Sequence, residues 1–119
     1  MLKRFSVLLI VVVVFNCEAL IEVEDISNEA ILVLAPADNS TLNTTTVNFS
    51  WQSLEFAETY HLQIAIPNFE SAQAIVEDTL ISLTNHTKTL SEGNYQWRVR
   101  ATNFGYETQY TTQTITIED

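Results

Sequence analysis

The chain has 119 residues, of which 15 are acidic and five are basic, so its formal net charge at pH 7 is −10. Such a charge argues against nucleic acid as a partner, because phosphates need a basic surface, and against adsorption to anionic lipid headgroups. With two glycines and one cysteine, the composition also excludes a glycine-rich phosphate loop and a disulfide within the chain.

The first 16 residues have the order of an export signal. Lys3 and Arg4 precede an apolar run from Phe5 to Phe15. This run is shorter than the roughly 20 residues that a membrane-spanning helix needs, and it has the length of a signal-peptide core. The sole cysteine, Cys17, follows directly after Asn16. We therefore predict a signal peptide over residues 1–16 and lipid attachment at Cys17.

Residues 14–17, Val-Phe-Asn-Cys, resemble the lipobox of bacterial lipoproteins, whose cysteine is acylated and becomes the new N-terminus. The resemblance implies a membrane anchor of several acyl chains such as palmitate. Each buried methylene contributes about 0.8 kcal/mol, so two or more chains hold a protein stably on a membrane. The alternative is ordinary signal-peptidase cleavage after Ala19, which would leave a soluble protein.

Residues 17–28 are predicted to be an acidic tether, because they mix acids with isoleucine and valine and show no periodic apolar face. The acids close to Cys17 resemble the export signal of Bacteroidota surface lipoproteins. They are Glu18, Glu22, Glu24 and Asp25. This resemblance implies a lipid-anchored location in the cell envelope, on the periplasmic or the outer side of the outer membrane.

Residues 29–118 carry the pattern of one all-β domain. The apolar residues 30–35 end at Pro36, and residues 47–52 and 60–66 alternate apolar with polar side chains up to Pro67. Residues 95–101 show the clearest alternation, and no window has a helical stripe. Seven short strands between turn signals indicate a β-sandwich. The predicted strands are residues 30–35, 47–52, 60–66, 74–77, 80–87, 95–101 and 109–117.

Three parts of this pattern resemble a fibronectin type III domain over residues 29–118. They are Trp51, the run Tyr60-x-Leu62-x-Ile64, and the run Leu90-x-x-Gly93-x-Tyr95-x-Trp97-x-Val99-x-Ala101-x-Asn103-x-Gly105. The resemblance implies a seven-stranded immunoglobulin-like β-sandwich with Trp51 packed between its two sheets. It also implies a tyrosine corner, in which the Tyr95 hydroxyl bonds to the backbone upstream. One such domain behind a lipobox is most similar to small Bacteroidota lipoproteins.

The sequence offers no catalytic constellation. His61 and His86 are the only histidines, and neither has a cysteine or a second histidine at a metal-ligand spacing, so both are expected to be surface residues. No serine or threonine lies in a nucleophile elbow. The acid pair Glu77–Asp78 would need a deep cleft to act as acid and base, which so small a sandwich is not expected to have. We predict no catalytic residue, no metal, no cofactor and no enzymatic activity.

Two further features concern modification and binding. Asp78-Thr79-Leu80 resembles the O-glycosylation motif of Bacteroidota, which implies a glycan on Thr79, between two predicted strands. Arg98 and Arg100 alternate with inward residues and are expected on the outer face of one strand, where they would either pair with neighbouring acids or bind an acidic partner or glycan.

Three functions fit these features. The first is a non-enzymatic, lipid-anchored interaction module that binds an envelope protein. The second is a glycan-binding module that uses Phe69, Phe104 and Tyr106 as a stacking platform. The third is a structural accessory subunit of an envelope complex. Clustered aromatic side chains would favour the glycan, and an apolar patch would favour the protein.

Overall fold

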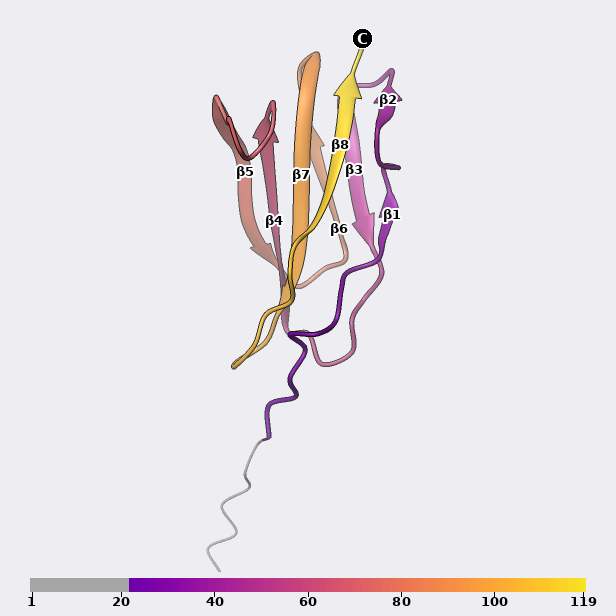
Figure 1. The fold of residues 1–119 in the computed structure, drawn as a ribbon. Helices are drawn as coiled ribbons and strands as arrows, with labels where there is room; N and C mark the ends of the chain where they lie inside the picture. Colours follow the sequence, from indigo (N-terminus) through magenta and orange to yellow (C-terminus); the bar gives the residue numbers. More distant parts are fainter. Residues whose placement is uncertain (1–21) are drawn as a thin grey trace, which may run out of the picture.

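The computed structural model describes residues 22–119, which form eight β-strands and, within this part, no helix (Figure 1). The predicted signal peptide and Cys17 lie outside the described residues. Across residues 22–119 we find no helix with the length and apolar character to cross a membrane. The strands are β1 (Val33–Ala35), β2 (Ser40–Leu42), β3 (Thr46–Trp51), β4 (Thr59–Ile66), β5 (Ala74–Ile81), β6 (Asn85–Thr89), β7 (Gly93–Thr102) and β8 (Thr111–Ile117).

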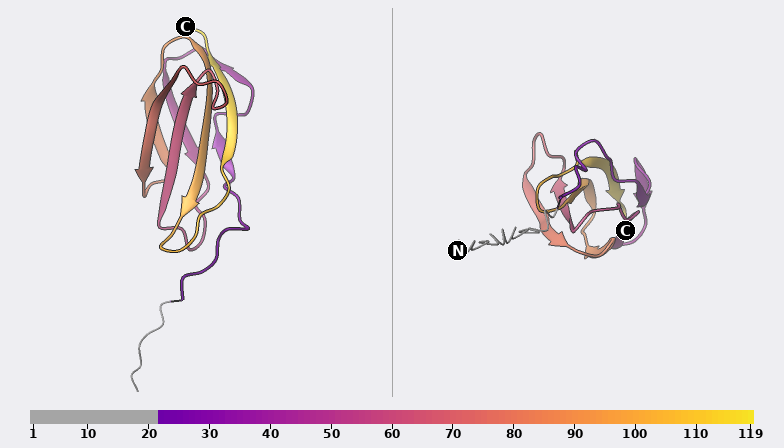
Figure 2. Two further views of the ribbon diagram at one scale, coloured as in Figure 1. Left: turned by 60° about the vertical axis from the view of Figure 1, so that its left-hand side comes forward. Right: turned by 90° about the horizontal axis from the view of Figure 1, so that it is seen from below.

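The strands form two layers (Figure 2). One sheet has the order β1-β3-β6 and the other the order β2-β8-β7-β4-β5, and every pairing is antiparallel except that of β2 with β8. The chain enters from residue 22 at one end of the sandwich, and the C-terminus lies at the opposite end (Figures 1 and 2). The prediction of an immunoglobulin-like β-sandwich is confirmed, with eight strands instead of seven.

The additional strand is β2, in which the chain passes from one sheet to the other after Pro36. The turn residues fasten it in place. Asn39, with φ of 60°, donates its backbone N–H to Thr114 O at 2.7 Å, and Asp38 Oδ1 accepts the backbone N–H of Thr114 at 2.7 Å. Asparagine tolerates this left-handed conformation better than most residues. A strand of three residues is too short to show a period of two, so the sequence pattern missed it.

The core is built from the inward side chains of β3, β4, β7 and β8. Phe49, Leu62 and Val99, on three of these strands, are fully buried. Trp97 packs edge-on against Phe49, with ring centroids 4.8 Å apart, and Trp51 packs in the same way against Tyr60 at 5.7 Å. The alternation read from residues 47–101 therefore identifies the inner face correctly.

Two features at the ends of the sandwich complete the core. The ring of Tyr95 is buried, and its hydroxyl donates to Ser91 O at 2.8 Å, which confirms the tyrosine corner. At the other end, Ile26 is 2% exposed and belongs to the core cluster. The acidic segment predicted to be a tether thus contributes a core residue, and the folded unit begins before residue 29.

The sequence prediction was wrong about the fourth and fifth strands. Residues 74–77 and 80–87 were expected as separate strands, but β5 runs without a break from Ala74 to Ile81. Glu77 interrupts the apolar pattern and yet lies inside the strand, opposite the buried Ile64. Its carboxylate is held by His86 Nε2 at 3.1 Å and Lys88 Nζ at 3.3 Å, both on β6. Polar side chains therefore join the edges of the two sheets, and an inward-pointing charge on an edge strand also disfavours its pairing with another chain.

This bridge predicts a pH dependence of stability. Burial acts to raise the pKa of Glu77, but the hydrogen bonds from His86 and Lys88 outweigh it, so the pKa lies below the ordinary value of 4.5. The stability that the ionised carboxylate supplies is complete above that value and is lost as the pH falls through the lower folded-state pKa. Glu77→Gln should therefore lower the free energy of unfolding by about 1 kcal/mol at pH 7 and by much less at pH 3.

Urea unfolding at the two pH values measures this effect. Glu70→Gln, at an exposed loop position, is the matched control and should follow the parent at both. An equal loss for Glu77→Gln at pH 7 and pH 3 would show that the carboxylate charge is not what stabilises the bridge.

Candidate interaction surface

Two arginines and two aromatic residues meet on the outer face of the five-stranded sheet, and we call them the arginine–aromatic cluster. Arg98 and Arg100 alternate with the buried residues of β7, so both point outward. Tyr110 directly precedes β8, and Phe69 lies on the loop between β4 and β5. The antiparallel pairing of β7 with β8 places Arg98 opposite Thr112 and therefore brings Arg100 beside Tyr110.

The side chains of the cluster stack on one another. The Cζ atom of Arg98 lies 4.0 Å from the Phe69 ring centroid and 4.2 Å from that of Tyr110. The Cζ atom of Arg100 lies 4.5 Å from the Tyr110 ring centroid. Guanidinium groups at such distances are attracted by the ring quadrupole, typically by about 0.5–1 kcal/mol at exposed sites and by more when desolvated.

Polar contacts hold the stack at both ends. Arg98 Nε donates to Gln63 Oε1 on β4 at 2.8 Å. The loop that carries Phe69 is tied to β7, because the Phe69 backbone N–H donates to Gln96 Oε1 at 2.9 Å. The guanidinium of Arg98 is therefore fixed in position by two rings and one amide.

One of the two arginines of the cluster contacts a carboxylate of the described residues, and the other does not. Among residues 22–119 there are three cations, and Lys88 contacts Glu77 at 3.3 Å while Arg100 contacts Glu107 at 3.2 Å. Arg98 has no carboxylate oxygen of the described residues within 4.0 Å. The expected pairing with neighbouring acids is thus found for Arg100 and is absent for Arg98 within the described part of the chain.

A chain of hydrogen bonds borders the cluster. His61 lies between two partners, with Nε2 2.5 Å from Asp78 Oδ1 and Nδ1 2.8 Å from the Tyr110 hydroxyl. The hydrogen bond with His61 is the main cause of a lowered pKa of Asp78, and burial raises the pKa of Tyr110. Among residues 22–119 no group of three potential metal ligands gathers. These hydrogen bonds therefore orient the Tyr110 ring, which both arginines contact.

Sequence reasoning missed this chain of bonds. His61 was expected to be a plain surface histidine, and Asp78 was considered in an acid pair with Glu77 and in the glycosylation motif with Thr79, but not as a partner of His61. Strand register explains the contact, because β4 and β5 pair His61 with Leu80 and Gln63 with Asp78. One diagonal step on the outer face brings the histidine and the carboxylate together. A prediction with the correct bounds of β5 would have placed Asp78 on the outer face beside His61.

The structure also places the remaining predicted site residues. Thr79 is half-buried in the middle of β5, opposite the buried Leu62, and not between two strands as expected. His86 bonds to Glu77 at the sheet edge. Glycosylation of Thr79 stays a prediction, and so does acylation of Cys17.

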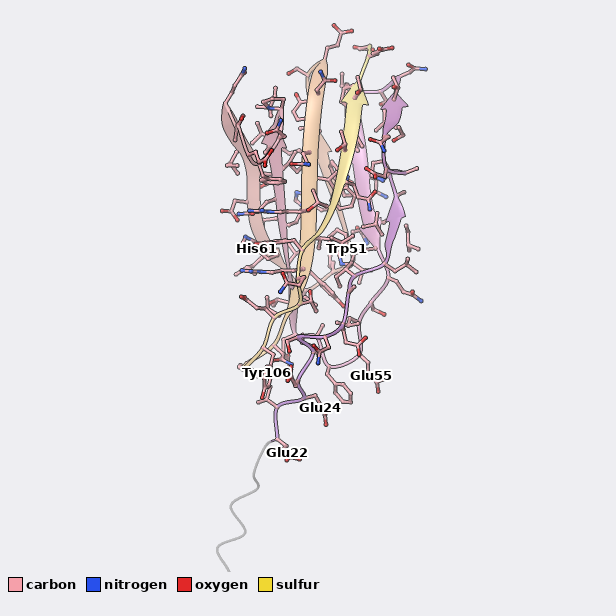
Figure 3. All side chains as sticks on the ribbon, viewed as in Figure 1. Glu22, Glu24, Trp51, Glu55, His61 and Tyr106 are labelled. Carbon is pink, nitrogen blue, oxygen red and sulfur yellow. The ribbon has the colours of Figure 1, made fainter. Side chains whose placement is uncertain are left out.

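The three aromatic residues expected to form a glycan platform do not gather on one surface. Phe69 belongs to the arginine–aromatic cluster, whereas Phe104, which is 86% exposed, lines a pocket with Phe56 at the end where the chain enters. Tyr106 lines a neighbouring pocket at that end. Figure 3 shows Tyr106, Glu24 and Glu55 toward the end of the sandwich where the chain enters, with His61 farther along the strands. Acidic side chains surround these pockets: Glu22, Glu24, Asp25, Glu29, Glu55, Glu58 and Glu107.

Comparison with known proteins gives similarity at the level of structure. No family model matches the chain, and no curated protein matches it in sequence. Fibronectin(III)-like modules of CbhA from Clostridium thermocellum match with a TM-score of 0.55 at 10% identity, over 74% of this chain and 95% of the module. The protein FN3tt matches with a TM-score of 0.53 at 18% identity, over 74% and 88%. A fibronectin type III domain from human KIAA0970 matches with a TM-score of 0.53 at 16% identity, over 73% and 72%. Residues 22–119 therefore have the fibronectin type III fold.

Proposed function

We propose that this protein is a non-enzymatic, lipid-anchored module of the cell envelope that binds another protein through the outer face of its five-stranded sheet. The arginine–aromatic cluster carries the proposal, because arginine and aromatic residues are enriched where proteins bind one another and supply most of the binding energy there. Apolar side chains extend the same face along β5, where Leu80 is 64% and Ile75 is 48% exposed.

The stacking geometry favours a protein partner over a glycan. A sugar packs on the open face of an aromatic ring, but guanidinium groups already lie against Tyr110 from both arginines and against Phe69 from Arg98. Phe56 and Phe104 are the observation that favours glycan binding as a second candidate, at the end where the chain enters.

The open surface supports a role without catalysis. His61 bonds to both Asp78 and Tyr110 on the face of a sheet, and the pockets at the end where the chain enters are lined by other residues. A general acid or base acts on a substrate held within hydrogen-bond reach. A partner protein, by contrast, can cover a flat face of this kind.

The direction of the chain supports an anchored arrangement. Residue 22 lies at the end of the sandwich opposite the C-terminus (Figure 1), and Cys17 precedes it closely in the sequence. The long axis of the strands would then lead away from the membrane, and the outer face of the five-stranded sheet would be open to a neighbouring envelope protein.

Capture from the native membrane tests the proposal. Intact, affinity-tagged protein is solubilised in mild detergent and its partners are quantified by mass spectrometry, for the parent and two arginine variants. Leu80→Arg alters the outer face of the five-stranded sheet, and Thr87→Arg alters an exposed position on β6 in the other sheet. We expect one protein that the parent and Thr87→Arg recover equally and that Leu80→Arg loses at least tenfold. Equal recovery by both variants, or no protein above the level of an untagged strain, would contradict the proposal.

A further inference from the structure

We propose that Arg98 is the residue that receives a carboxylate of the partner protein, from an aspartate, a glutamate or a chain end. This inference rests on the proposed function and names the chemistry that the outer face recognises. It predicts that one guanidinium, and not the arginine–aromatic cluster as a whole, decides which segment of the partner binds.

The guanidinium of Arg98 is ordered before any partner arrives. Phe69 and Tyr110 lie against it at 4.0 and 4.2 Å, and Gln63 accepts the hydrogen bond from its Nε. Within residues 22–119, no hydrogen bond or carboxylate contact engages its two Nη groups. A planar guanidinium stacked in this way keeps its in-plane donors available, and less side-chain entropy is lost when they bind.

The charge distribution indicates that these donors serve an external acid. Residues 22–119 contain far more acids than cations, yet Arg98 is the cation among them without a carboxylate of its own within 4.0 Å. Asp78, on the same face, contacts His61, and the charge of Arg98 acts on it only from beyond 4.0 Å. A carboxylate matches the two parallel N–H donors of a guanidinium, and such charge-assisted pairs are roughly twice as strong as neutral ones.

The surroundings of Arg98 allow such a contact and confine it to this spot. Thr112, opposite Arg98 on β8, is exposed, so the short side chain leaves the approach open. Acids far outnumber cations in residues 22–119, so the rest of the surface disfavours a partner's carboxylate, and repulsion of this kind helps to fix the register of an interface.

Zero-length coupling in the native host tests the inference. In Arg98→Lys the charge and the aliphatic stem remain, and the new amine can be joined by carbodiimide to a carboxylate that touches it. We expect an isopeptide bond between residue 98 of this variant and an aspartate, a glutamate or the C-terminus of the partner that the parent captures. Arg98→Gln should lower recovery of that partner at least tenfold, and Lys88→Gln, which removes a cation on β6, should leave recovery unchanged.

The outcomes separate this inference from the proposed function. Unchanged recovery by Arg98→Gln, no isopeptide bond at residue 98 in Arg98→Lys, or coupling only to Asp78 of the same chain would each overturn the role of Arg98. The proposed function would stand in those cases as long as Leu80→Arg still loses the partner. The proposed function itself would fail in the capture experiment, if the parent recovered no protein that Leu80→Arg loses.

Discussion

Replacing Trp97 with alanine should unfold the domain. Trp97 is fully buried between the sheets and packs edge-on against Phe49 at 4.8 Å. Removing so large a side chain leaves a cavity and costs about 3–5 kcal/mol, which is comparable with the whole stability of a small domain. Thermal melting followed by near-ultraviolet circular dichroism should show a loss of the cooperative transition or a large drop in Tm.

Two matched variants show whether the loss comes from the core. Trp97→Phe should cost much less than the alanine variant, because the indole Nε1 is buried without a hydrogen-bond partner in the described residues and so has no bond to lose. Phe104→Ala, at a ring that is 86% exposed, should melt like the parent. An alanine variant at residue 97 that melts within a few degrees of the parent would show that the assigned inner face of β7 is wrong.

Replacing Cys17 with serine should release the protein from the membrane. If the cysteine carries several acyl chains, its loss removes the whole anchor, because the acidic remainder of the chain has little affinity for anionic lipid. We expect the parent in the membrane pellet after carbonate extraction and Cys17→Ser in the soluble fraction or held as unprocessed precursor.

The mass of the mature protein distinguishes the two modes of processing. Acylation predicts a mature chain that begins at Cys17 and carries the added mass of its acyl groups. Cleavage after Ala19 predicts a chain that begins at Leu20 with no added mass, and the serine variant would then behave like the parent. A serine variant that has lost its signal peptide and still remains in the membrane pellet would reject the lipid anchor.

The period of two predicted most of the fold, because burial alternates with position along most of the core strands. It identified β3, β4 and β7 and the buried residues Phe49, Leu62 and Val99. The period of two failed at two places where polar interactions, and not the burial of apolar side chains, hold a strand in position. Glu77 lies on an inward position of β5 because His86 and Lys88 of β6 bond to it, and β2 is held on β8 by the turn at Asp38 and Asn39.

The interaction surface was only partly predictable for a related reason. Alternation placed Arg98 and Arg100 on the outer face of one strand, as the structure has them. Their partners come from the register of three strands and from a loop that folds back, and a single sequence does not give either. Phe69 therefore could not be assigned to Arg98, and the contact between His61 and Asp78 was missed.

One measurement tests most directly whether the outer face of the five-stranded sheet is the binding surface. A photo-crosslinking amino acid is placed at Thr112, which lies opposite Arg98, or at Thr87 on the other sheet, in the full-length protein in its native host. We predict a single protein adduct from residue 112, at a partner segment that contains an acid, and none from residue 87. Adducts from residue 87 alone, or from neither position while the protein is folded and on the membrane, would contradict this account.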